Sequence, residues 1–213
     1  MKIRVLILLF SMTLMGCQSA YYSAWEKLGV EKRDILADRV ESAKSAQEDA
    51  QAEFTSALEQ LSQLISFDGG ELQNTYEALK DQYESSLNSA ERVGSRINSI
   101  ENVADALFDE WEDELSQYTN ESLRRSSEQQ LKSTKRRYQT LLKTMRKAES
   151  SMQPVLATLN DNVLYLKHNL NASAVGALQN ELSQVQKDVK TLITEMNIAI
   201  AQSEEFITLL NKN

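Results

Sequence analysis

VGALQNELSQVQKDVKTLITEMNIAIAQSEEFITLL, residues 175–210, carries the most regular hydrophobic pattern of the chain. Its seam residues recur at alternating spacings of three and four, and they are Val175, Leu178, Leu182, Val185, Val189, Leu192, Met196, Ala199, Ser203, Phe206 and Leu210. Side chains at this spacing form one stripe along a helix and keep it against a partner helix. The stretch therefore predicts a long α-helix that belongs to a bundle.

Three further segments repeat this pattern, and we expect helices over about Glu31–Phe67, Glu71–Gln117 and Glu121–Leu170. The first seam is Leu36, Val40, Ala43, Gln47, Ala50, Phe54, Ala57, Leu61 and Leu64. The second is Leu72, Tyr76, Leu79, Tyr83, Ser86, Ala90, Val93, Ile97, Ile100, Ala104, Leu107 and Trp111. The third is Leu131, Thr134, Tyr138, Leu141, Met145, Ala148, Met152, Val155, Leu159 and Leu166. With no alternating strand pattern, the fold class is all-α, an elongated antiparallel four-helix bundle or coiled coil.

Turns between the helices are marked in different ways. Asp68-Gly69-Gly70 ends the first helix, because glycine readily adopts the left-handed conformation. A hairpin near Thr119 or Asn120 is inferred from charge, since acidic residues precede it, basic residues follow it, and Asn120 can cap the next helix. One continuous helix through this region is the alternative. At Asn169–Ser173 an Asn can close one helix and a Ser can cap the next.

Two irregularities of the bundle are also expected. Pro154 predicts a kink or a short break around Ser150–Gln153, because proline removes a backbone donor and crowds the preceding turn. The four helices differ in length. The longer pair should therefore extend beyond the others as a two-stranded tip.

The N-terminal segment predicts export and lipid attachment. Lys2 and Arg4 precede a short apolar run that ends in Leu14-Met15-Gly16-Cys17, and this sequence resembles a bacterial lipobox. Cleavage before Cys17, the only cysteine, would leave it to carry acyl chains. The domain plan is then a signal peptide over 1–16, a membrane-proximal tether over 17–30 and one helical domain over 31–213. An ordinary signal peptide or an uncleaved anchor is the alternative.

The tether contains three aromatic residues, Tyr21, Tyr22 and Trp25. They could lie at the lipid headgroups beside the anchor or cover the end of the bundle, and the sequence leaves both open. Gln18 stands after the cysteine where an Asp commonly marks inner-membrane retention in Gram-negative lipoproteins. By that resemblance the expected location is the outer membrane, facing the periplasm.

Composition and motifs indicate no catalytic, cofactor or metal site. The chain has 31 acidic and 23 basic residues, a net charge of −8, which loss of Lys2 and Arg4 with the signal would lower to −10. No glycine fits a phosphate-binding loop, and His168 is the only histidine. An acidic run over Asp105–Glu114 lies on a straight helix, which offers calcium too few converging oxygens. We therefore expect a protein that is not an enzyme, and an envelope enzyme using His168 is the remote alternative.

Basic residues gather between Arg124 and Lys147. They invite a nucleic-acid hypothesis, but Tyr138 is the only aromatic residue among them and lies on the apolar seam, so a platform for base stacking is missing. The expected partners are therefore the membrane, through acylated Cys17, and an envelope protein or a second copy of the chain, with no nucleic acid.

Three stretches carry a family resemblance. Val163–Ala172 (VLYLKHNLNA), Ala106–Trp111 (ALFDEW) and the basic segment between them resemble a family of proteobacterial proteins catalogued as a domain of unknown function (number 2959). The resemblance spans nearly all of the mature chain. It implies a helical, lipid-anchored envelope protein, and no catalytic residue is carried over with it.

The sequence thus predicts a non-enzymatic, lipid-anchored envelope protein that serves as a structural or docking module facing the periplasm. The alternative is a cytoplasmic or inner-membrane coiled-coil protein that contacts nucleic acid or anionic lipid through the basic segment.

Overall fold

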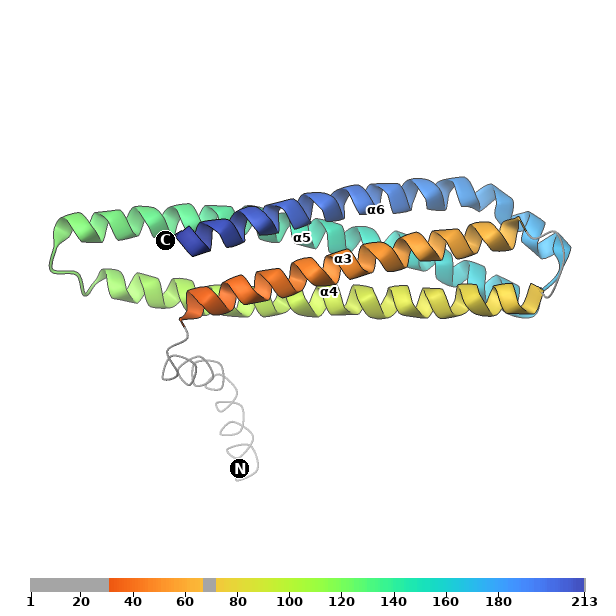
Figure 1. Ribbon diagram of the computed structural model, residues 1–213, viewed down its shortest axis with the longest axis horizontal. Helices are drawn as coiled ribbons and strands as arrows, with labels where there is room; N and C mark the ends of the chain where they lie inside the picture. Colours follow the sequence, from red (N-terminus) through yellow and green to blue (C-terminus); the bar gives the residue numbers. More distant parts are fainter. Residues whose placement is uncertain (1–30, 67–71, 213) are drawn as a thin grey trace, which may run out of the picture.

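Four long helices make up the part of the protein that the computed structural model describes, residues 31–66 and 72–212 (Figure 1). They are α3 (Lys32–Ile65), α4 (Leu72–Leu115), α5 (Glu121–His168) and α6 (Ala172–Lys212). Helices α3 and α5 each pack against both α4 and α6. Successive helices run in opposite directions, so the predicted all-α antiparallel bundle is confirmed.

The predicted seams form the core. Every seam residue of α3 and α5 is buried, and so are all those of α6 except Leu182, which is half-buried. In α4 the half-buried exceptions are Leu72, Tyr83 and Trp111. Burial of each large aliphatic or aromatic side chain contributes about 1.5–3 kcal/mol, so these continuous stripes stabilise the bundle along its whole length.

The buried stripes are wider than the predicted seams. Residues beside the seam are also buried, and they include Ile35, Ile65, Val103, Phe108, Leu156 and Val163. A helix in a four-helix bundle touches two neighbours, so it needs a broader apolar face than a helix in a two-stranded coiled coil.

A two-stranded tip is formed by the end of α4 and the start of α5 (Figure 1, left). Lys32 Nζ, at the start of α3, lies 2.9 Å from Glu110 Oε1 of α4. Near the end of α6, Leu210 lines the same surface depression as Leu107 of α4 and Thr134 of α5. Beyond this level α4 and α5 have only each other as neighbours among the described residues, which confirms the predicted tip.

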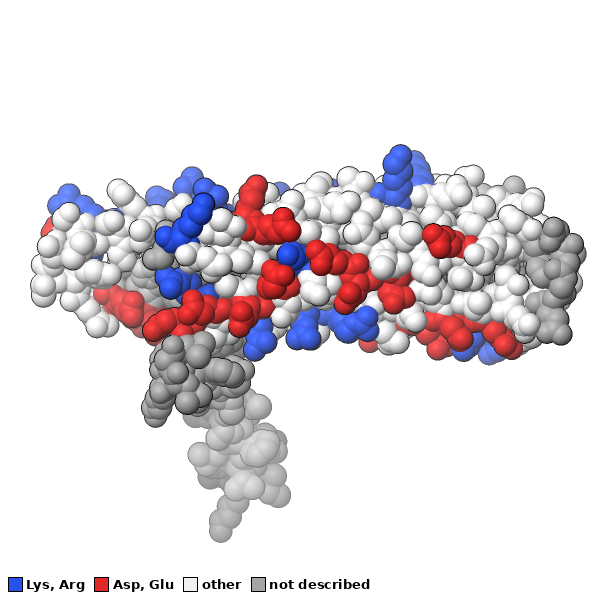
Figure 2. Space-filling view, viewed as in Figure 1, with Lys and Arg blue, Asp and Glu red and all other residues white. Residues whose placement is uncertain are grey.

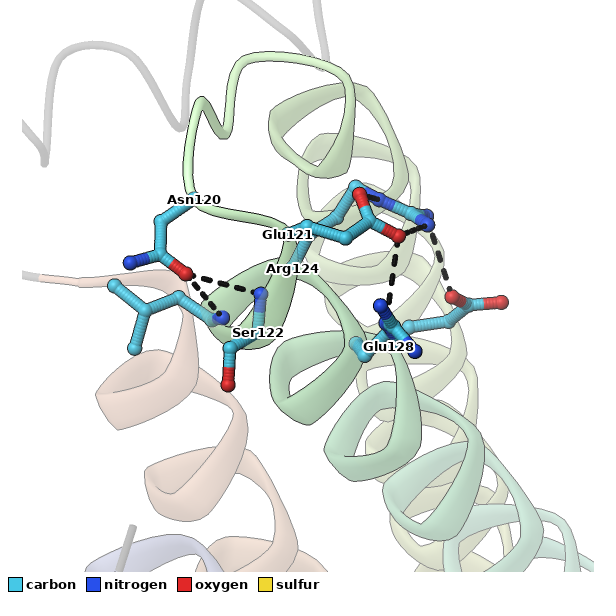
Figure 3. Close-up of polar contacts among 7 residues, drawn as sticks. Asn120, Glu121, Ser122, Arg124 and Glu128 are labelled. Atoms are coloured by element: carbon cyan, nitrogen blue, oxygen red, sulfur yellow. Dashed lines mark hydrogen bonds and ion pairs between the residues drawn. The ribbon is translucent and has the colours of Figure 1, made fainter.

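Asn120 closes the tip by capping α5. Its Oδ1 atom accepts hydrogen bonds from the backbone N–H groups of Ser122 (2.9 Å) and Leu123 (3.2 Å) (Figure 3). Glu121 adds a negative charge in the first turn, which the helix dipole favours. The predicted hairpin is confirmed, and the alternative of one continuous helix is wrong.

Helix α5 continues through Pro154, so of the kink or short break expected around Ser150–Gln153 the break is wrong, and the kink stays a prediction. Pro154 is exposed, whereas Met152 and Val155 on either side are buried in the core. Proline costs one backbone hydrogen bond here, and burial of its neighbours holds the helix in place.

Asn171 rather than Ser173 caps α6. The Asn171 Oδ1 atom accepts from the N–H of Ala174 (3.1 Å), and Ser173 lies inside the helix. At the end of α5 the Asn169 N–H donates to the carbonyl of Leu166 (3.1 Å), so the predicted closing role of that residue is confirmed. The turn predicted at Asp68-Gly69-Gly70 lies outside the described residues.

Candidate functional site

Cys17, predicted to carry lipid, lies outside the described residues, together with the signal over 1–16 and the aromatic tether over 17–30. The described helices show only at which end of the bundle these residues join it. Helix α3, which follows the tether, starts beside Glu110, close to the tip of the α4–α5 hairpin. Any anchor N-terminal to α3 is therefore joined to the tip end of the bundle and not to the end that carries the α5–α6 turn.

The acidic residues of α4 and the basic residues of α5 lie side by side, as predicted from the charge blocks. Lys135 pairs with Glu112, and Arg146 pairs with Glu101. The Arg146 guanidinium also donates to Asn98 Oδ1 at 2.6 Å and to Glu149 Oε2 at 2.8 Å. This part of the charged surface stabilises the antiparallel pairing of α4 with α5.

Two groups on this surface, Arg146 and Asp105, have shifted pKa values. Burial by itself lowers the pKa of Arg146, but hydrogen bonds to Glu149 and Glu101 outweigh it and raise the pKa above its ordinary value. Asp105 has a raised pKa, first because of partial burial and then because of the neighbouring Asp109 and Glu101. The guanidinium is a structural cation at any pH that the protein meets.

Aromatic rings of three helices meet behind this ionic surface. Phe108 of α4 and Tyr138 of α5 pack edge to face with centroids 5.4 Å apart, and Phe206 of α6 lies 6.3 Å from Tyr138. Lys135 Nζ lies over the Phe108 ring, 5.4 Å from its centroid. Burial, followed by Asp105 and Glu101, raises the pKa of Tyr138. Tyr138 is therefore a neutral core residue and does not present its ring to a ligand.

The remaining predicted candidates do not converge on a reaction centre. His168 is the exposed last residue of α5 and has no side-chain hydrogen bond within residues 31–66 and 72–212. The acidic run on α4 contacts Lys32 of α3 through Glu110 and Lys135 of α5 through Glu112, and the described residues contain no cluster of three potential metal ligands. None of the described helices combines the length and apolar character needed to cross a membrane.

A row of exposed cations follows the outer face of α5, and we call it the α5 basic stripe: Arg125, Lys132, Arg136, Lys143 and Lys147. At 100° of rotation per residue, these positions fall within about 60° of one another and opposite the buried seam of the helix. Figure 2 shows Lys and Arg side chains along the upper left edge of the molecule, over the first part of α5, separate from the Asp and Glu below them.

The stripe divides into paired and unpaired members. Arg125 Nε lies 3.4 Å from Glu121 Oε1, and Lys147 Nζ lies 3.0 Å from Glu195 Oε1. In the described part of the chain, no carboxylate comes within ion-pair distance of Lys132, Arg136 or Lys143. These three cations of the stripe are available to a partner.

The basic segment was predicted from the sequence, but its division into two faces was not. Lys135 and Arg146 face α4 and are neutralised there, whereas Lys132, Arg136 and Lys143 face away from the bundle. The helical phase relative to Tyr138 and Met145 would have separated the two sets. The interpretation of the segment as one block opposite the acidic residues missed this.

Comparison with known proteins identifies a family and no activity. A family sequence profile with the description "Protein of unknown function (DUF2959)" matches residues 21–210. The matched range includes the whole of α3, α4 and α5 and nearly all of α6. No curated protein matches the chain.

Proposed function

The chain belongs to the DUF2959 family, and because that family brings no activity with it, we propose a function from the features of the chain itself. The protein is a lipid-anchored component of the bacterial envelope that faces the periplasm from the outer membrane. It acts as a non-enzymatic spacer or docking module for another envelope component or for a second copy of itself.

The observation that carries this proposal is the position of Cys17. The sole cysteine follows Leu14-Met15-Gly16 at the end of a short apolar segment, which is the arrangement that a lipoprotein signal requires. An apolar run of this length is too short to span a bilayer, for which about 20 residues are needed. Acyl chains on Cys17 would then supply the membrane attachment.

The shape of the bundle supports the spacer role. Helix α5 has 48 residues and is therefore about 72 Å long at 1.5 Å per residue. Because α3 starts near the tip, the α5–α6 turn is at the far end of this rod from the tether. A tethered bundle of this length can present that turn to a component well away from the site of attachment.

Metabolic labelling with a fatty-acid analogue tests the anchor. We expect label on the natural chain in the outer-membrane fraction and no label on Cys17→Ser. A matched control, Gln18→Asp, keeps the cysteine and should keep the label while moving the protein to the inner membrane. Label and location that are unchanged in Cys17→Ser would refute the proposal and favour a cytoplasmic or inner-membrane protein.

The non-enzymatic part of the proposal has its own test. His168 is the only side chain of the chain with an ordinary pKa near neutrality, so a hydrolytic or transferase activity would be expected to depend on it. We expect His168→Ala to leave the cellular phenotype of the protein unchanged. A phenotype equal to that of gene deletion, in a variant that remains folded and correctly located, would favour an enzyme.

A further inference from the structure

The α5 basic stripe is long and exposed, and its three central cations, Lys132, Arg136 and Lys143, have no ion pair among the described residues. From Arg125 to Lys147 it extends about 33 Å along α5, and the unpaired part from Lys132 to Lys143 extends about 17 Å. Residues 129–148 contain seven Lys or Arg residues and no Asp or Glu. The chain as a whole has a net charge of −8, so this segregation places a positive surface on an anionic protein.

Carboxylates flank the stripe without covering it. Glu205 of α6 lines a groove of about 360 Å³ beside Arg136, and Glu128 and Glu112 line another beside Lys132. None of these three carboxylates forms an ion pair with the stripe. The cations at its centre therefore remain available for phosphate groups supplied from outside.

The shape of the stripe favours a flat partner. It lies opposite the core seam of α5, and so forms the outermost line of the bundle on that side, which a plane can touch along its length. It offers no enclosed pocket for a small anion, and Tyr138, the aromatic residue of the segment, is buried. Recognition of single strands or of a base sequence would need exposed rings for stacking or side chains directed at base edges, whereas non-specific binding to a duplex needs only cations, so duplex DNA is a competitor that the test below includes.

We propose that the α5 basic stripe is an electrostatic contact surface for the anionic phospholipid headgroups of a bilayer. The choice of a membrane over other polyanions rests on the proposed anchor, because α3 joins the bundle at the same end as the stripe, although α3 and α5 are diagonally opposite helices of the bundle. Each Lys or Arg near an anionic bilayer strengthens binding about fivefold. The stripe is then a second, weaker attachment that lays the first half of α5 along the leaflet.

Flotation with vesicles tests the contact independently of acylation. The full chain with Cys17→Ser is mixed with vesicles of phosphatidylcholine alone or with 30 mol% phosphatidylglycerol. We expect binding to the anionic vesicles to exceed binding to neutral ones at least tenfold, and to fall steeply as salt is raised, because screening shortens the reach of the charges. The N-terminal segment is the same in every variant, so it does not contribute to differences between variants.

The decisive comparison is between two triple charge reversals. Lys132→Glu/Arg136→Glu/Lys143→Glu should lower binding to the anionic vesicles by about tenfold or more. The control, Arg96→Glu/Lys187→Glu/Lys190→Glu, makes the same change in net charge at exposed residues that have no ion pair in the described part of the chain. We expect it to retain binding within about threefold. If the first variant does not fold, the corresponding Gln substitutions test the same charges.

Three outcomes overturn the proposal. Equal binding to neutral and anionic vesicles would show that the contact is not electrostatic. Equal losses in both triple variants would show that binding depends on the net charge of the protein and not on the stripe. Displacement of the vesicles by duplex DNA at equal phosphate concentration would assign the stripe to nucleic acid. A failure here leaves the labelling of Cys17 unaffected, whereas a failure of labelling with selective binding to anionic vesicles would refute only the anchor.

Discussion

Lys32 Nζ lies 2.9 Å from Glu110 Oε1, and this contact joins the first turn of α3 to the last turns of α4. The lysine side chain is only 11% exposed, so it is held along the α4 surface as well as paired at its end. The contact marks the level at which the bundle changes from four helices to two. The stability of the tip beyond it depends on local interactions, such as the cap that Asn120 provides for α5.

Asn120→Ala should destabilise the protein by about 1 kcal/mol, because two N–H groups at the start of α5 lose their acceptor. For a chain of this length the expected fall in Tm is about 2–4 °C. Asn120→Asp is the matched control, since its carboxylate also accepts these bonds. Thermal unfolding followed by circular dichroism measures both, and an unchanged Tm in Asn120→Ala would show that the tip opens before the bundle unfolds.

Gln47→Leu should stabilise the protein. Gln47 is fully buried on the α3 seam, and neither atom of its amide has a hydrogen-bond partner among the described residues. Burial of an unsatisfied amide costs about 1–3 kcal/mol, and Leu has a similar volume without the polar atoms. Urea unfolding measures the gain. Gln63→Leu, exposed on the same helix, should have no comparable effect, and destabilisation by Gln47→Leu would mean that the amide is satisfied in the protein.

Glu195→Gln should make stability less dependent on acid pH. Burial raises the pKa of Glu195, but hydrogen bonds from Ser151 and Lys147 outweigh this and leave the pKa below the ordinary 4.5. A lowered folded pKa contributes stability above the unfolded pKa, and this contribution is lost as pH falls through the folded value. The variant should lose about 1 kcal/mol at pH 7 and little near pH 3.

Urea unfolding of this variant at pH 7, 5.5 and 3.5 gives the profile. Glu181→Gln, an exposed position on the same helix, is the control and should stay within about 0.5 kcal/mol of the natural chain throughout. A loss in Glu195→Gln that is constant with pH would mean that the side chain contributes through packing and not through its charge.

Pro154→Ala should stabilise the protein by about 1–3 kcal/mol. Alanine restores the backbone N–H in the interior of α5 and is about 3 kcal/mol more favourable than proline there, partly offset by the greater entropy of the unfolded chain. Gln153→Ala, the exposed neighbour, should change little. A lower Tm for Pro154→Ala would show that the proline ring has a packing role despite its exposure.

Sequence periodicity was sufficient to predict the core because a bundle buries side chains at a fixed spacing. Leu36 and Leu166 were placed correctly by spacing alone, and the charge switch before Arg124 located the hairpin that Asn120 caps. At Pro154 the local cost of proline predicted a kink or a short break, and burial of the adjoining turns keeps the helix unbroken. The cap of α6 is Asn171 because of the backbone path of the turn, and the spacing of apolar residues does not encode that path.

The site was less accessible to prediction than the fold. The spacing of apolar residues placed Gln47 on a seam. Whether its amide finds a hydrogen-bond partner depends on which side chains of the other helices lie at the same level of the core. Lys132 and Lys135 are three residues apart, yet one faces outward without a carboxylate partner and the other pairs with Glu112. Helical phase contains this difference, whereas the density of basic residues does not.

The two-stranded tip also implies a gradient of local stability along the molecule. Tyr118 and Leu123, at 40% and 57% exposed, bury little apolar surface, whereas Phe54 and Leu159, in the four-helix part, are fully buried. Opening a segment costs a free energy set by the contacts that it gives up. Amide hydrogens of the tip should therefore exchange through local opening, well below the free energy of global unfolding. A binding partner could separate or reshape this end of the rod while the rest of the bundle stays folded.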